Sequence, residues 1–157
     1  VDEVFKKACR VYETEKLLHI VPYEGAAETL QLLQSLGYTM GIVTDAYSRD
    51  ATMRLEKTRL LEFFCCMVSY DMVKVKKPDP APFRFALEML NAIPGETVLV
   101  GDSPRRDIEP SRNLGMRTVY ARYGDRFSKD RITVIADYCI DSLRDLPEIL
   151  SRYKRKT

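Results

Sequence analysis

The chain has 157 residues, and its 45% hydrophobic and 31% charged residues are typical of a folded globular domain, which argues against disorder or a disulfide scaffold. Its 25 basic and 23 acidic residues leave a formal net charge of +2, which gives no indication of a basic nucleic-acid-binding surface. No apolar stretch reaches the roughly 20 residues needed to cross a bilayer, and no signal peptide opens the sequence. We therefore expect a cytoplasmic protein with neither nucleic acid nor membrane as a partner.

The cysteines also favour a location in the cytoplasm. Cys9, Cys65, Cys66 and Cys139 include no pair at CxxC spacing, and their apolar neighbours predict buried thiols in a reducing cytosol. The single histidine, His19, and the absence of clustered ligands in the sequence argue against a zinc site.

Apolar residues at helical spacing and short apolar runs divide the sequence into alternating elements. In chain order we predict a helix over 2–19, a helix over 26–36, a strand over 38–43, a helix over 49–61, a strand over 66–69, a basic loop over 74–80, a helix over 81–90, a strand over 97–100, a helix over 107–114, strands over 117–121 and 136–140, and a helix over 143–153. Strands that alternate with helices indicate an open α/β fold, with a parallel sheet joined by right-handed crossovers.

Polar residues stand where three of these strands end. Thr44 and Asp45 follow the first strand, Ser69 ends the second, and Asp102 and Ser103 follow the third. Because ligands of open parallel sheets bind outside the carboxyl ends of the strands, we expect the functional site among these residues.

Asp102 and Asp107 form an acidic pair around a turn that Gly101 permits. If the loop folds back, two carboxylates flank one point, and such oxygen ligands suit Mg²⁺ bound together with a substrate phosphate. The alternative is that Asp102 caps the loop and Asp107 caps a helix N-terminus.

Thr44 and Lys77 are candidate phosphate-binding residues. A hydroxyl at a strand end, beside free backbone N–H groups, can hold a phosphate oxygen. The alternative for Thr44, favoured when the residue is taken alone, is a helix N-cap. Lys77 lies in a loop that Pro78 and Pro80 stiffen, so its ammonium could stabilise charge on a phosphoryl group. The alternative for Lys77 is a solvated charged loop.

Taken together and in this order, Thr44, Lys77, Asp102 and Asp107 resemble the motifs of the haloacid dehalogenase (HAD) superfamily of hydrolases. The resemblance covers about residues 1–150 and is greatest to the phosphoglycolate-phosphatase-like branch. It implies a Rossmann-like three-layer α/β core with a parallel sheet, and Mg²⁺-dependent hydrolysis of a small phosphorylated metabolite.

The resemblance also implies a role for each residue. Thr44, together with Asp45, would bind the transferring phosphoryl group, and Lys77 would neutralise charge on it. Asp102 would bind Mg²⁺, and Asp107 would support the metal or Lys77. Catalysis would then depend on Lys77 and Asp107 within this chain.

One motif of the family is missing from this sequence. Such enzymes attack with an aspartate of an Asp-x-Asp motif on an N-terminal strand, and no two aspartates here are two positions apart. In the family's sheet that strand lies between the strands that end at Thr44 and Asp102, so its omission would open a gap.

We therefore interpret residues 1–20 as the remnant of a helical cap that is otherwise largely absent, and residues 21–157 as the core without its first strand. The initial residue Val1 fits the C-terminal part of a longer hydrolase. The missing N-terminal segment or a second copy of the chain is then an expected partner. The alternative is a non-catalytic module that binds phosphate or a partner. A dehalogenase is disfavoured because the metal aspartate Asp102 would have no task there.

Overall fold

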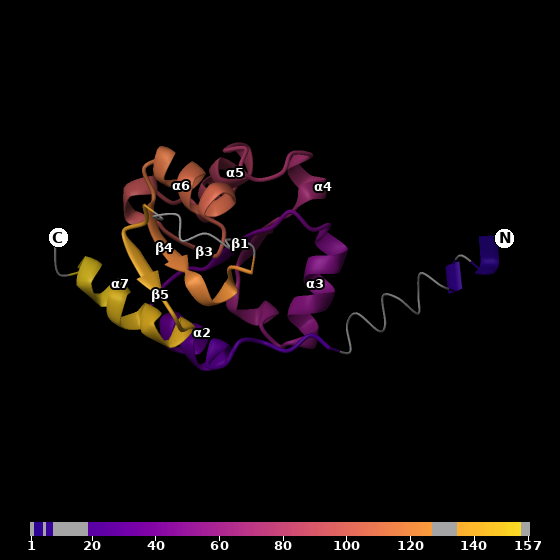
Figure 1. Cartoon of the computed structure of the whole chain (residues 1–157), viewed down its shortest axis with the longest axis horizontal. Helices are drawn as coiled ribbons and strands as arrows, with labels where there is room; N and C mark the ends of the chain where they lie inside the picture. Colours follow the sequence, from indigo (N-terminus) through magenta and orange to yellow (C-terminus); the bar gives the residue numbers. More distant parts are fainter. Residues whose placement is uncertain (1, 5, 8–18, 127–134, 155–157) are drawn as a thin grey trace.

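The strands lie at the centre of the molecule in two short parallel sheets, as the computed structural model shows (Figure 1). In the first sheet β1 (Gly41–Val43) pairs with β2 (Cys66–Val68). In the second the order is β3 (Val98–Gly101), β4 (Arg117–Ala121) and β5 (Tyr138–Ile140), with β5 at the edge as predicted. Every ladder is parallel, which confirms the predicted α/β class.

The structure describes residues 2–4, 6–7, 19–126 and 135–154. Its helices are α2 (Ala26–Ser35), α3 (Ser48–Lys57), α4 (Tyr70–Val73), α5 (Ala81–Leu90), α6 (Glu109–Asn113) and α7 (Leu146–Lys154). A π-helical turn over Pro104–Ile108 precedes α6. Among the described residues, no helix is long and apolar enough to cross a membrane.

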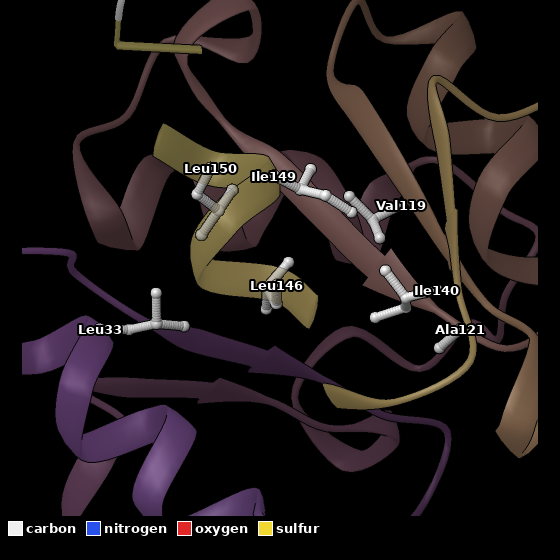
Figure 2. Close-up of a cluster of buried hydrophobic side chains, with 7 residues drawn as sticks. All are labelled: Leu33, Val119, Ala121, Ile140, Leu146, Ile149 and Leu150. Carbon is white, nitrogen blue, oxygen red and sulfur yellow. The ribbon is translucent and has the colours of Figure 1, made fainter. Parts of the chain in front are cut away.

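Helices cover both faces of the strands (Figure 1). Leu33 of α2 and Ile149 of α7 meet Val119 of β4 and Ile140 of β5 in one buried cluster (Figure 2). On the other side of the molecule α5 packs against β1 and β2, with Phe83 almost wholly buried. Burial of these apolar side chains provides the main stabilisation of the fold.

The boundary between the two sheets falls between β1 and β3. Within the part of the chain that the structure describes, no ladder joins these two strands. Gly41 of β1 is exposed and all four residues of β3 are only partly buried, whereas Val119 in the middle of β4 is fully buried. Parallel sheets are normally covered on both faces. The boundary is where the resemblance to hydrolases places a further strand.

Several element boundaries differ from the sequence prediction. The helix predicted over 49–61 ends at Lys57, because Arg59 adopts a left-handed backbone with φ of 56° and the Leu60 N–H turns back to the Leu55 carbonyl. The predicted strand over 38–43 begins only at Gly41. Helix α4 was not predicted.

Two predictions about the surface and the N-terminus have different outcomes. Cys65 and Cys139 are exposed, so the prediction that these thiols are buried is wrong, because β2 begins only after Cys65 and β5 is an edge strand. Most of the predicted helix over 2–19 lies outside the described residues, although residues 2–4 and 6–7 are helical.

Candidate functional site

Thr44 directly continues β1. Its N–H donates to the Val68 carbonyl at 2.8 Å, which extends the β1–β2 ladder by one bond. The Thr44 hydroxyl oxygen accepts from the Ala46 N–H at 3.2 Å, which leaves the hydroxyl proton available for a ligand. The residue that precedes α3 is Tyr47, so Thr44 is not the cap of that helix.

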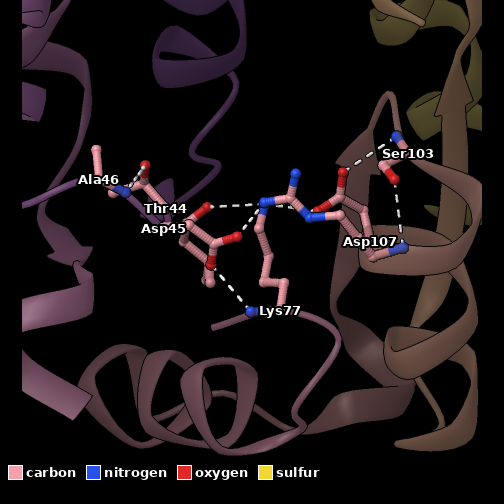
Figure 3. A network of polar contacts seen from close by, with 8 residues as sticks. Thr44, Asp45, Ala46, Lys77, Ser103 and Asp107 are labelled. Atoms are coloured by element: carbon pink, nitrogen blue, oxygen red, sulfur yellow. Dashed lines mark hydrogen bonds and ion pairs between the residues drawn. The ribbon is translucent and has the colours of Figure 1, made fainter. Parts of the chain in front are cut away.

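Lys77 lies inside the site. Its Nζ donates to Asp107 Oδ1 at 2.6 Å and to the Val43 carbonyl at 3.5 Å, and its side chain is only 15% exposed. The alternative of a solvated charged loop is therefore wrong for Lys77. The ammonium connects the end of β1 to the turn that follows β3, across the boundary between the two sheets (Figure 3).

Asp107 is held rigidly by its own loop. Its Oδ2 accepts from the Ser103 N–H at 3.1 Å, and its side chain is 8% exposed. Gly101 makes this position possible, since a Cβ there would lie 2.5 Å from the Asp107 Cβ. The acidic residue thus bonds within the turn on one side and to an ammonium on the other.

Asp102 carries a carboxylate that forms no ion pair with any described residue. Partial burial and then the charge of Asp107 raise its pKa above the ordinary aspartate value. No hydrogen bond reaches its side chain from the rest of the described chain. Gly124 leaves room for it, because a Cβ there would lie 2.8 Å from Asp102 Oδ2. A cation beside Asp102 would relieve the repulsion from Asp107.

The carboxylate oxygens of the site suit Mg²⁺ only if a substrate phosphate and water supply the remaining ligands of the ion. Within the described segments, no three His, Cys, Asp or Glu side chains form a cluster that could hold a metal ion. Mg²⁺ is commonly held by one or two carboxylates with water and substrate phosphate as its other ligands. Asp102 can supply such a carboxylate, whereas both oxygens of Asp107 already accept hydrogen bonds.

Asp45 links the site to Arg106, a residue that the sequence analysis did not single out. Asp45 Oδ1 accepts from the Lys77 backbone N–H at 2.9 Å, and Oδ2 pairs with Arg106 Nη2. The only sequence signal for Arg106 is its position between the two members of the acidic pair. Its side chain is 51% exposed, whereas that of Asp45 is 16% exposed.

Tyr123 lies near the acidic side of the site. Burial, together with Tyr23 and Asp102, raises its pKa to about 12, so the hydroxyl is neutral at physiological pH. Its ring packs edge-to-face on Tyr23 with centroids 4.9 Å apart. Neither tyrosine was among the predicted site residues.

The structure therefore brings Asp45, Lys77 and Asp107 into one contact network, with Thr44 next to Asp45 (Figure 3). Asp102 is close enough to Asp107 for their charges to interact. Counting Arg106, two cations face three carboxylates.

Three comparisons with known proteins bear on this site. The chain matches the family of haloacid dehalogenase-like hydrolases over residues 1–121. It is 35% identical over 142 residues to the glyceraldehyde 3-phosphate phosphatase of Pyrococcus furiosus, covering 90% of this chain and 59% of that protein. It is 38% identical over 130 residues to the pyrophosphatase PpaX of Bacillus mycoides, covering 83% of this chain and 60% of that protein.

The fold agrees with the sequence relatives. The structure superimposes on the HAD-hydrolase YfnB from Bacillus subtilis bound to magnesium with a TM-score of 0.72 at 25% identity, covering 82% of this chain and 55% of that one. The two sequence relatives are phosphatases named for different substrates. The chain spans about three fifths of their length.

Proposed function

Because this chain belongs to the haloacid dehalogenase-like hydrolase family, we propose that it forms the phosphate-binding part of a Mg²⁺-dependent phosphatase that acts on a small phosphorylated metabolite. The observation that supports this most directly is the buried Lys77 ammonium, held by Asp107 beside Asp102, whose carboxylate has no ion pair in the described part of the chain. A fixed cation and a free carboxylate at the ends of parallel strands suit a phosphate and its metal ion.

Each residue of the candidate site has a role in this proposal. Lys77 approaches one oxygen of the phosphoryl group and offsets its charge, with little reorganisation because Asp107 and Val43 already orient its ammonium. Thr44 donates its hydroxyl proton to a second oxygen. Asp107 acts through Lys77, and Asp45 positions the backbone of the same residue.

Asp102 is the residue that we assign to Mg²⁺, with Asp107 as the second acidic residue of the pair. The metal would supply charge neutralisation for the phosphate. The magnesium-bound YfnB structure supports a metal in a related fold, and the charge excess of the three carboxylates supports it in this chain.

The nucleophile must come from outside this chain, because the sequence holds no Asp-x-Asp pair. No strand ladder joins β1 to β3 beside Lys77 among the residues that the structure describes, which supports a donor strand at that boundary. We propose that an N-terminal segment, absent from this sequence, provides it. A second copy of this chain could pair with the strand edges but could not supply the nucleophile, because it lacks the same Asp-x-Asp pair. The greater length of the relatives is consistent with such an N-terminal segment.

The second candidate is a non-catalytic module that binds phosphate or a partner. The missing Asp-x-Asp pair favours it, whereas the intact group of Thr44, Lys77, Asp102 and Asp107 favours the phosphatase. The ligand is a phosphate for the phosphatase and for the phosphate-binding form of the module, and in both cases we propose a cytoplasmic protein without nucleic acid or membrane as a partner.

Phosphatase assays and phosphate titrations separate these two functions. We expect the protein that includes the N-terminal segment with the nucleophile to hydrolyse p-nitrophenyl phosphate only with Mg²⁺. In the same protein, the variant K77A should lose about 10²–10³-fold in kcat. Phosphate binding without hydrolysis would favour the binding module. Absence of phosphate binding at any Mg²⁺ concentration would contradict both the phosphatase and a phosphate-binding module, and would leave only a module that binds a partner. E88Q, on the exposed surface of α5, is the control.

A further inference from the structure

Arg106 has hydrogen-bonding capacity that the proposed function leaves unused. A guanidinium carries five N–H donors, and its Nη2 pairs with Asp45. No other described side chain bonds to this guanidinium. The Arg106 side chain is 51% exposed, whereas that of Lys77 is 15% exposed. The site thus has an inner buried cation and an outer cation open to solvent.

One carboxylate holds both cationic residues in place. Asp45 Oδ1 accepts from the Lys77 N–H, while Oδ2 pairs with Arg106. The Arg106 N–H also donates to Ser103 Oγ at 3.3 Å, in the turn that orients Asp107. Because both ends of Arg106 are anchored, binding an anion costs little additional ordering of its side chain.

We propose that Arg106 binds a second anionic group of the substrate, so that the site selects phosphate esters that carry a further phosphate or a carboxylate. This inference rests on the proposed function, in which Lys77 and Asp102 hold the phosphate to be transferred. A planar guanidinium is suited to either second group, because its parallel N–H donors match both carboxylate and phosphate oxygens.

The competing explanation is purely structural. Arg106 follows β3 and Asp45 follows β1, so their ion pair could serve only to connect the two sheets. If the ion pair only connects the sheets, breaking it would lower the stability of the fold and would weaken the binding of all phosphate ligands equally. A binding role would change the preference between ligands.

Calorimetric titration of the full chain with three phosphonates at one free Mg²⁺ concentration tests the proposal. Methylphosphonate has one anionic group, phosphonoacetate adds a carboxylate, and methylenebisphosphonate adds a second phosphonate. We expect at least one of the last two to bind about fivefold more tightly than methylphosphonate, the upper range for an ion pair at an exposed position. Which of the two gains affinity identifies the second group.

Variants assign the gain to Arg106. R106Q should reduce the ratio between the affinity for the ligand with two anionic groups and the affinity for methylphosphonate to about one, while methylphosphonate still binds. R106K should retain part of the preference for the ligand with two anionic groups. R105Q is the matched control, because Arg105 is exposed and has no ion pair with any described residue. Equal affinities in the wild type, or a ratio that survives in R106Q, would overturn the proposal. If methylphosphonate does not bind to the wild type at all, this result would instead contradict the proposed function.

Discussion

Lys77 and Asp107 are 30 residues apart in sequence, yet Lys77 Nζ lies 2.6 Å from Asp107 Oδ1 and both side chains are largely buried. Lys77 precedes α5 and Asp107 lies in the turn after β3. The pair joins two parts of the molecule that no strand ladder connects within the described residues.

Breaking this pair should destabilise the fold. K77M leaves the Asp107 carboxylate buried without its cation, and we expect a loss of about 3 kcal/mol in the free energy of unfolding. The double variant K77M/D107N should recover part of that loss, because an asparagine oxygen can still accept from Ser103 without carrying charge. Urea unfolding measures both. A double variant less stable than K77M would show that Asp107 is needed for another reason.

The approach of Asp107 to Gly101 should make that glycine sensitive to substitution. In G101A the new Cβ would meet the Asp107 Cβ at 2.5 Å and Cγ at 2.9 Å, so the turn must shift. We expect a loss of about 1–3 kcal/mol in stability, together with weaker phosphate binding. G95A is the control, since a Cβ there meets no atom within 4 Å. Equal stability of G101A and G95A in thermal unfolding would argue against close packing at Gly101.

Mg²⁺ should stabilise the protein through Asp102. A free Mg²⁺ concentration 100 times its dissociation constant would add about 2.7 kcal/mol to the free energy of unfolding. D102N should remove this gain in stability, whereas E88Q, at an exposed position of α5, should retain it. The measurement is the melting temperature across a magnesium titration. A gain that persists in D102N would remove Asp102 from the metal site.

Asp71 should give the stability a pH dependence in the acid range. The Ser48 hydroxyl and N–H donate to Asp71 at 2.5 and 2.7 Å and hold the pKa of this carboxyl below its ordinary value. A lowered pKa in the folded state stabilises above the unfolded pKa of about 3.9, and the effect is lost as the pH falls below it. D71N should therefore be less stable than the wild type at pH 7, and the difference should shrink below about pH 4. A difference that stays constant from pH 7 to pH 3 would contradict this assignment.

The α/β alternation was predictable because apolar spacing is a local property of the sequence. Strand β4 and helix α5 have the predicted bounds, Arg117–Ala121 and Ala81–Leu90. Helix α4 was missed because its four residues are too few for a periodic pattern. The end of α3 was missed because the left-handed backbone at Arg59 is not signalled by a glycine.

The fold class and the residue types at the strand ends can be inferred from the sequence alone, because apolar spacing and residue type are local properties. A parallel sheet then places the carboxyl ends of its strands at one edge, where ligands bind. The folded structure was needed to show three further facts: Lys77 is buried against Asp107, Asp102 has no ion pair among the described residues, and Asp45 contacts Arg106. These facts depend on contacts between residues far apart in the chain. Packing and electrostatics, which have no local sequence period, select such contacts.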